Sequence, residues 1–388
     1  MPTRPVTPTL WLLLTLICPG LVGCMGASWP GVEDGLAASP RGGDQTVVAF
    51  ASCLHERRAA PIFRPLLDAD PDVLVMMGDN AYIDLPDRPR RAADFRAAYR
   101  RLARQPYWRD LVQRVPVVAT WDDHDYGYND AGRRWRLKET AKQEFMQFFG
   151  VPMDARMRGH AGIYSSVTFG PPGRRLQIIL LDTRTFRGDL RKKVAAGLRS
   201  GGPYRPTSDR NRPFLGEAQW RWLEATLRRP ADLRLLVSSV QVVSREHGWE
   251  CWGNFPHELQ RLYGLIDRTG AGRVIALSGD RHFAEVSVDR DPVAPYPLWD
   301  ITSSGLNQKT KSVSEPNRYR VGEAHRRSNF GLLQVDWSRP LPRVRVDLIG
   351  EDGSSFESTD IDVAELTVPG AEPPTRRRLF GIFDDSDG

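Results

Sequence analysis

Short apolar runs alternate with helical stretches along most of this chain. The runs that read as strands are Thr46–Ala51, Val73–Met77, Val117–Trp121, Leu176–Leu181, Leu233–Val240, Val274–Ser278, Pro297–Thr302, Gly331–Trp337 and Arg343–Ile349. The stretches that read as helices are Ala92–Arg104, Leu137–Phe149, Gly216–Arg228 and Pro256–Arg268. Because strands that alternate with helices form sheets covered on their faces, the pattern predicts an α/β fold.

The N-terminus has the composition of an export signal. Arg4 precedes the apolar run Leu10–Ile17, which is shorter than the roughly 20 residues needed to span a bilayer. Such a run is typical of the apolar core of a secretory signal. The tetrapeptide Leu21-Val22-Gly23-Cys24 follows and resembles a bacterial lipobox. We therefore expect a protein exported to the bacterial cell envelope and anchored to a membrane by lipid on Cys24. A plain signal peptide with an incidental cysteine is the alternative.

The rest of the chain divides by composition. Residues 1–23 form the expected signal peptide, and residues 24–45, rich in Gly, Ala, Ser and Pro, read as a flexible tether. One domain is predicted over residues 46–365, and residues 366–388 are expected to be a loosely ordered tail. The net charge of +6 is spread thinly and lacks a nucleic-acid-binding motif. We expect a monomer without a specific nucleic acid partner.

Polar residues crowd the carboxyl ends of four predicted strands, where α/β folds place their sites. These residues are Ser52, Cys53 and His55 after the first strand, Asp79 and Tyr82 after the second, Asp122–Asp125 after the third, and Asp280–His282 after a later one. One such strand end would be an ordinary turn. Four of them together predict a site.

The order of these motifs resembles the alkaline phosphatase D branch of the metallophosphoesterase superfamily. A Ser-Cys pair opens the domain, Gly-Asp-x-x-Tyr follows at Gly78–Tyr82, and Trp-Asp-Asp-His-Asp lies at Trp121–Asp125. The last motif, Gly-Asp-x-His, lies at Gly279–His282. The resemblance extends from about residue 46 to about residue 335. It implies an αββα sandwich of two packed mixed sheets flanked by helices, and a metal-dependent hydrolase acting on phosphate mono- or diesters.

The resemblance also implies a dinuclear metal site that activates a hydroxide. Cys53, Asp79 and Tyr82 are three anionic donors, which suit Fe³⁺ better than Ca²⁺ or Mg²⁺. Asp123 is a hard oxygen donor suited to a neighbouring Ca²⁺, and Asp280 and His282 complete the expected set of ligands. Two other readings stay open: Tyr82 as a packing aromatic, and Cys53 in a disulfide with Cys251.

Charged residues beside these ligands are candidates for catalysis. His124 is expected to donate a proton to the leaving oxygen, and Asp125 to orient its ring. Arg281 is a candidate for binding phosphoryl oxygens during catalysis, and Arg184 for binding substrate, since guanidinium groups bind phosphate bidentately. A structural salt bridge is equally open for Arg184.

One departure weakens the expected second metal site. Many metallophosphoesterases place a histidine ligand after the fourth core strand, where this chain has Ser238, Ser239, Val240 and Gln241. Gln241 or water would have to fill that role. The rival function is a surface-anchored binding protein on a degenerate phosphoesterase scaffold, which should have lost several ligands. The long basic segments 187–213 and 305–328 are expected to form the rim of the pocket.

Overall fold

The computed structural model describes residues 36–37, 43–153, 155–193, 201–291 and 293–370. The expected signal peptide, Cys24, most of the tether and residues 371–388 of the tail lie outside the described residues. Within the described ranges, none of the helices combines the length and apolar character needed to cross a membrane.

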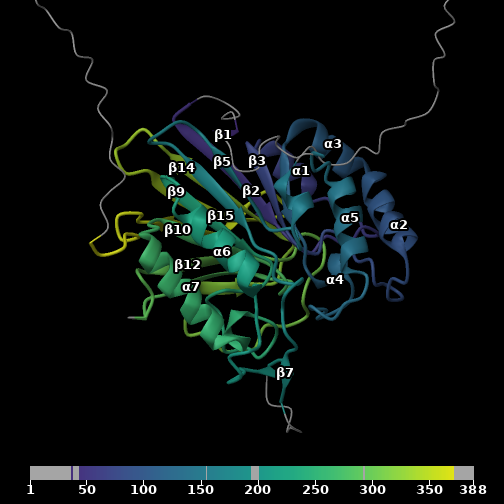
Figure 1. Cartoon of the computed structure of the whole chain (residues 1–388). Coiled ribbons are helices and arrows are strands. Elements are labelled where there is room, and N and C mark those ends of the chain that lie inside the picture. Colours follow the sequence, from purple (N-terminus) through teal and green to yellow (C-terminus); the bar gives the residue numbers. More distant parts are fainter. Residues whose placement is uncertain (1–35, 38–42, 154, 194–200, 292, 371–388) are drawn as a thin grey trace, which may run out of the picture.

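Two large mixed sheets form the centre of the domain (Figure 1). The larger sheet has the strand order β1 (Leu36–Ala37), β5 (Ser165–Phe169), β6 (Leu176–Leu180), β9 (Leu233–Ser238), β10 (Val274–Ser278), β12 (Leu298–Ser303), β11 (Ala284–Asp289) and β13 (Arg320–His325). The smaller sheet has the order β16 (Ser355–Ile361), β15 (Arg343–Gly350), β14 (Asn329–Asp336), β2 (Gln45–Ala51), β3 (Val73–Met77) and β4 (Val117–Thr120).

Each sheet has a parallel centre whose strands are buried on both faces. β2, β3 and β4 are mutually parallel in the smaller sheet, and β6, β9, β10 and β12 are parallel in the larger one. Every residue of β3, β4, β9 and β10 is buried, as expected for parallel strands covered on both sides. Parallel strands end at the same edge, so each sheet presents several strand ends together.

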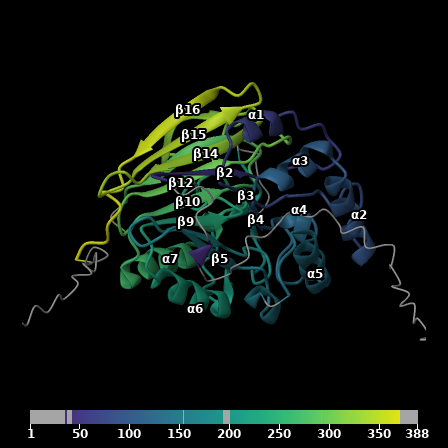
Figure 2. The same cartoon turned by 90° about the horizontal axis from the view of Figure 1, so that it is seen from above.

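Helices cover the sheets from outside. The α-helices are α1 (Phe63–Asp68), α2 (Ala92–Ala103), α3 (Pro106–Arg114), α4 (Asp123–Tyr126), α5 (Lys138–Phe148), α6 (Gly216–Leu227) and α7 (Pro256–Thr269). Two 3₁₀ turns, η1 (Arg156–Gly159) and η2 (Trp252–Asn254), and a small ribbon of β7 (Arg191–Lys192) with β8 (Tyr204–Arg205) complete the described elements. In Figure 2, α6 and α7 lie below the larger sheet, while α1, α2, α3 and α5 gather beside β2–β4.

Helix α7 shows how the sequence sets these boundaries. Pro256 occupies its first turn, where no backbone donor is needed. Leu259, Leu262 and Ile266 are buried at helical spacing. Gly270 ends the helix in the left-handed region at φ 63°.

The predicted α/β sandwich is confirmed by this architecture, although three details differ from the sequence analysis. Helices α1, α3 and α4, of six, nine and four residues, were not predicted because short helices give a weak sequence signal, and strands β5, β11, β13 and β16 were not named either. The segment predicted as a tether contains β1, which pairs in parallel with β5. At the other end, Leu366 is buried and its carbonyl accepts a hydrogen bond from the Arg273 amide, so the expected loose tail begins packed on the domain.

Candidate metal centre

The polar residues predicted from the sequence converge where strands of the two sheets end. Cys53 follows β2, Asp79 follows β3, Asp123 opens α4 after β4, and Asp280 and His282 follow β10. Four of them adopt positive φ: Cys53 at 62°, Asp79 at 52°, Asp280 at 71° and His282 at 60°. Non-glycine residues rarely adopt this conformation, and its concentration in one place is typical of functional sites.

Two glycines let these strand ends approach one another. A Cβ on Gly78, whose φ is 105°, would lie 2.6 Å from Cβ of Asp122, so the exits of β3 and β4 could not pack as closely. A Cβ on Gly279 would lie 2.6 Å from Oγ of Ser52. Gly279 follows β10 in the larger sheet and Ser52 follows β2 in the smaller one, so the absence of a side chain at Gly279 lets these two strand ends meet. Both glycines are therefore required by close backbone approach.

One group of donors matches the set expected for iron. Ligand atoms of Cys53, Asp79 and His282 lie within 4.8 Å of one another. The Tyr82 hydroxyl donates to Oδ2 of Asp79 at 3.2 Å and lies 2.9 Å from Nε2 of His282. The Cys53 thiol lies 3.5 Å from the same Oδ2. Thiol, phenol, carboxylate and imidazole thus point at one another in a buried place.

Further groups of donors share residues with the first. Asp79, Asp123 and His124 form one such group, and Asp122, Asp123 and Asp280 form another. Asp79 therefore belongs both to the thiol-containing group and to the group with Asp123 and His124. The residues expected to bind metal are brought together.

The chemistry of these donors fits bound cations. Burial raises the pKa of Cys53, Tyr82, Asp79 and Asp280 well above their usual ranges, so their anionic forms need positive charge nearby. Burial also lowers the pKa of His282 to about 4, which leaves a neutral imidazole whose lone pair can bind metal.

Two unpaired oxygens give independent support for bound cations. Among the described residues, Oδ2 of Asp122 and Oδ1 of Asp123 are buried without a hydrogen-bond partner. Buried carboxylate oxygens are normally paired, so these two atoms are suited to a cation.

His124 lies beside the cluster, and its ring is held by a residue that the sequence analysis missed. Nδ1 of His124 lies 2.7 Å from Oδ1 of Asp84, and its ring lies 4.3 Å from the Tyr82 ring. Burial alone would lower the pKa of His124, but Asp123, Asp79 and Asp84 raise it to about 11. Asp84 follows Tyr82 by two residues, and no motif marked it.

Asp125 does not orient His124, contrary to the sequence-based hypothesis. Its carboxylate accepts hydrogen bonds from the amide of Asp122 at 2.6 Å and from the amide of Asn80 at 3.1 Å. It therefore caps α4 and ties the β4 exit to the β3 exit. Neighbouring residues on a short helix turn point in different directions, which is why Asp125 faces away from the ring.

The two candidate arginines have different surroundings. Arg184 is fully buried: its Nε donates to Oδ1 of Asp122 at 2.6 Å and its Nη1 to Oε2 of Glu250 at 2.6 Å. This is the salt bridge that the sequence left open, and it replaces the substrate-binding assignment. Arg281 pairs with Oε1 of Glu315 at 3.0 Å, and its buried Nε has no partner among the described residues.

Two further alternatives are settled by position. Cys53 and Cys251 are buried free thiols, and Cys53 lies 3.3 Å from Oγ of Ser304. The amide of Gln241 donates to Glu285 at 2.6 Å and to Thr302 at 2.9 Å, so this side chain belongs to a polar network within the larger sheet.

One group of acidic residues was not predicted. Asp130 and Glu250 lie within 4.8 Å of Asp123. The Asp130 amide donates to Oδ2 of Asp123 at 2.5 Å, and Asp130 has a positive φ of 58°. These residues lie in irregular segments without a motif, and only the structure shows that they border the centre.

A cluster of carboxylates, thiol, phenol and imidazole at the strand ends of two mixed sheets is typical of a metal-dependent enzyme. The model of the PhoD-like phosphatase family matches residues 48–334, and the chain belongs to that family. It is therefore a phosphoric ester hydrolase.

Solved structures resemble this fold. The structure of PhoD superposes with a TM-score of 0.66 at 17% identity, over 87% of this chain and 74% of that one. The purple acid phosphatase PPD1 from yellow lupin (Lupinus luteus) seeds has a TM-score of 0.55 at 12% identity, over 87% of this chain and 55% of that one. At these identities the likeness concerns the fold. No curated protein matches the sequence.

Proposed function

We propose that this hydrolase is a lipid-anchored enzyme of the bacterial cell envelope that cleaves phosphate mono- or diesters with a dinuclear Fe³⁺–Ca²⁺ centre. The observation that carries the proposal is the position of Asp79. Its Oδ2 lies 3.2 Å from the Tyr82 hydroxyl and 3.5 Å from the Cys53 thiol, while the same carboxylate is grouped with Asp123 and His124. One carboxylate thus lies between two chemically different sets of donors.

The two sets of donors suit different cations. Cys53, Tyr82, Asp79 and His282 would hold iron, because thiolate and phenolate favour a strongly charged transition metal. Asp123, with Asp122 and Asp280 beside it, would hold calcium, because all its donors are carboxylate oxygens. When bound, such a pair of cations supplies an activated nucleophile and neutralises charge on the phosphoryl oxygens.

The proton for the leaving group would come from His124. Bound cations would offset the charges of Asp79 and Asp123, but Asp84 belongs to none of the metal-binding groups and keeps its contact at 2.7 Å. That contact favours the protonated ring and fixes its orientation. The unpaired Nε of Arg281 beside Asp280 would donate to a phosphoryl oxygen.

The location of the enzyme rests on the sequence alone. The apolar run Leu10–Ile17 followed by Leu21–Cys24 supports export and lipid attachment at Cys24. A tethered enzyme would act on esters close to the membrane surface. The rival, a binding protein on a degenerate scaffold, should have lost several donors; here one histidine is missing, while every motif keeps an Asp, His, Cys or Tyr and these donors converge.

Metal analysis combined with ester assays tests the proposal. Purified protein should contain both iron and calcium, and should hydrolyse p-nitrophenyl phosphate, bis(p-nitrophenyl) phosphate or both. A chelator should abolish this hydrolysis, and the two metals together should restore it. Full activity in protein freed of both metals would contradict the dinuclear mechanism, and a metal-loaded protein inactive on every ester would contradict the function.

A further inference from the structure

The segment 304–318 forms one wall of the candidate metal centre. The amide of His282 donates to Oγ of Ser304 at 2.8 Å, and the amide of Thr310 donates back to the carbonyl of His282 at 2.9 Å. Further along, Glu315 pairs with Arg281 at 3.0 Å. The segment is thus fixed to the strand end that carries two of the candidate ligands.

A cavity opens on the outer side of this wall. Its volume is about 460 Å³, and it is lined by Lys309, Thr310, Ala324, His325, Arg326 and Arg327. We call it the Lys309 pocket. Because Thr310 belongs to its lining and is hydrogen-bonded to the backbone of His282, the pocket begins next to the metal centre.

The lining of the Lys309 pocket is rich in positively charged side chains. Carboxylates are absent from its lining, and in the described ranges of the chain no ion pair joins a carboxylate to Lys309, Arg326 or Arg327. Arg326 is nevertheless held in place, because its Nη1 donates to the carbonyl of Lys311 at 2.6 Å. His325 is the exception, with Nε2 3.2 Å from Glu357. Clustered cations in a concave site attract anions.

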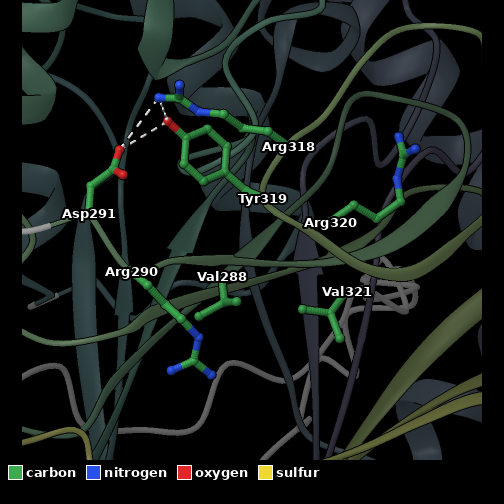
Figure 3. A pocket seen from close by; sticks show the side chains of 7 residues that line it. All are labelled: Val288, Arg290, Asp291, Arg318, Tyr319, Arg320 and Val321. Atoms are coloured by element: carbon green, nitrogen blue, oxygen red, sulfur yellow. Dashed lines mark hydrogen bonds and ion pairs between the residues drawn. The ribbon is translucent and has the colours of Figure 1, made fainter.

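A second basic hollow shows the contrast (Figure 3). It has a volume of about 290 Å³ and contains three arginines, each paired with a carboxylate. Arg318 lies 3.5 Å from Asp291, Arg320 lies 2.6 Å from Glu285, and Arg290 lies 3.4 Å from Glu365. Figure 3 shows Asp291 facing Arg318 and Tyr319. The arginines of this hollow are paired with carboxylates, whereas among the described residues Arg326 and Arg327 of the Lys309 pocket form no ion pair with a carboxylate.

We propose that the Lys309 pocket binds a second phosphate of the substrate, so that the preferred ester carries another phosphate on its leaving group. This inference rests on the proposed function, since it places the scissile phosphate at the metal centre. Lys309, Arg326 and Arg327 bind the second phosphate by charge-assisted hydrogen bonds, to which the Thr310 hydroxyl adds a neutral donor. The substrate class is therefore a bisphosphate or a longer phosphate-linked chain rather than an isolated phosphate ester.

Calorimetric titration of the metal-loaded, full-length protein with butyl phosphate and with butane-1,4-diyl bisphosphate tests this pocket. The two ligands differ by one phosphate, and the bisphosphate should bind about 10-fold more tightly. The combined change Lys309→Ser, Arg326→Ser and Arg327→Ser should bring this ratio close to 1. Arg290→Ser, which also removes a positive charge but lies in the other hollow, should leave the ratio unchanged. Metal content is measured after each titration, so that extraction of metal by the ligands is not read as binding.

Each outcome bears on the proposal. Equal affinity for the two ligands, or an unchanged ratio in the triple variant, overturns it, and so does an equal loss in Arg290→Ser, which would indicate only general attraction of anions. If the triple variant fails to fold, the single change Lys309→Glu at an exposed position provides the same comparison. Hydrolysis of p-nitrophenyl esters by the same samples tests the proposed function separately, because calorimetry does not depend on turnover.

Discussion

Replacing Arg184 should damage the stability of the protein rather than its affinity for substrate. Its guanidinium is fully buried between Asp122 and Glu250, with two hydrogen bonds of 2.6 Å. Glu250 also pairs with Nε of Arg187 at 2.7 Å. Arg184→Met keeps most of the apolar stem but leaves Asp122 without its cation. Breaking a buried pair in this way costs about 3–5 kcal/mol.

Protonation limits this cost and gives it a pH dependence. Burial raises the pKa of Asp122 to about 7, although Arg184 lowers it, so the pKa rises further when Arg184 is lost. When the pKa of a carboxyl group is higher in the folded than in the unfolded protein, the protein becomes less stable as the pH rises toward the folded pKa. In metal-free protein, Arg184→Met should therefore lower the free energy of unfolding by about 3 kcal/mol at pH 7, and by more above pH 7.

Equilibrium unfolding in urea with a chelator present measures this free energy, and steady-state kinetics of metal-loaded protein measure KM. Arg134→Met is the matched control, because Arg134 is exposed and pairs with Asp189 at 3.1 Å on the surface. It should unfold close to the wild type. If Arg184→Met unfolds like the wild type and only KM rises, the guanidinium contacts substrate and the structural assignment is wrong.

The remaining predictions concern the centre and the anchor. Asp79→Ala should lose both metals and nearly all activity while circular dichroism stays unchanged; retention of either metal would refute the bridging position. Tyr82→Phe keeps the ring but removes the oxygen, so the visible charge-transfer band of iron-loaded protein should vanish, and persistence of the band would make Tyr82 a packing residue. Asp84→Asn should lower kcat by about 10- to 100-fold with little change in KM or metal content, and an unchanged kcat would exclude a role for Asp84 in positioning His124. Cys24→Ala should abolish labelling with fatty acid and release the protein from the membrane fraction. A variant that is still labelled and still sediments with membranes would refute lipid attachment at Cys24.

The candidate ligands could be found from the sequence because they lie immediately after buried parallel strands. Cys53, Asp79 and Asp280 each follow an apolar run, and topology alone brings such strand ends to one edge. The partners of these residues could not be predicted in the same way. Asp84 reaches His124 across a loop, and Arg184 reaches Glu250 over 66 positions of the chain, so both contacts depend on backbone paths that no local pattern records. Burial decides the role of Arg184, and burial of a single polar residue is not visible in sequence.

The missing histidine after β9 is consistent with the proposed calcium site. In its place, the hydroxyl of Ser239 donates a hydrogen bond to Oδ1 of Asp122, which also accepts one from Nε of Arg184. Oδ2 of Asp122 is buried without a hydrogen-bond partner among the described residues. These contacts direct a free carboxylate oxygen toward Asp123 and Asp280, with which Asp122 is grouped. An imidazole at this position would favour a transition metal, whereas a site of carboxylates alone favours calcium. The oxygen donor found in place of a nitrogen donor therefore supports our proposal that the half of the centre with thiol and phenol would hold iron and the carboxylate half would hold calcium.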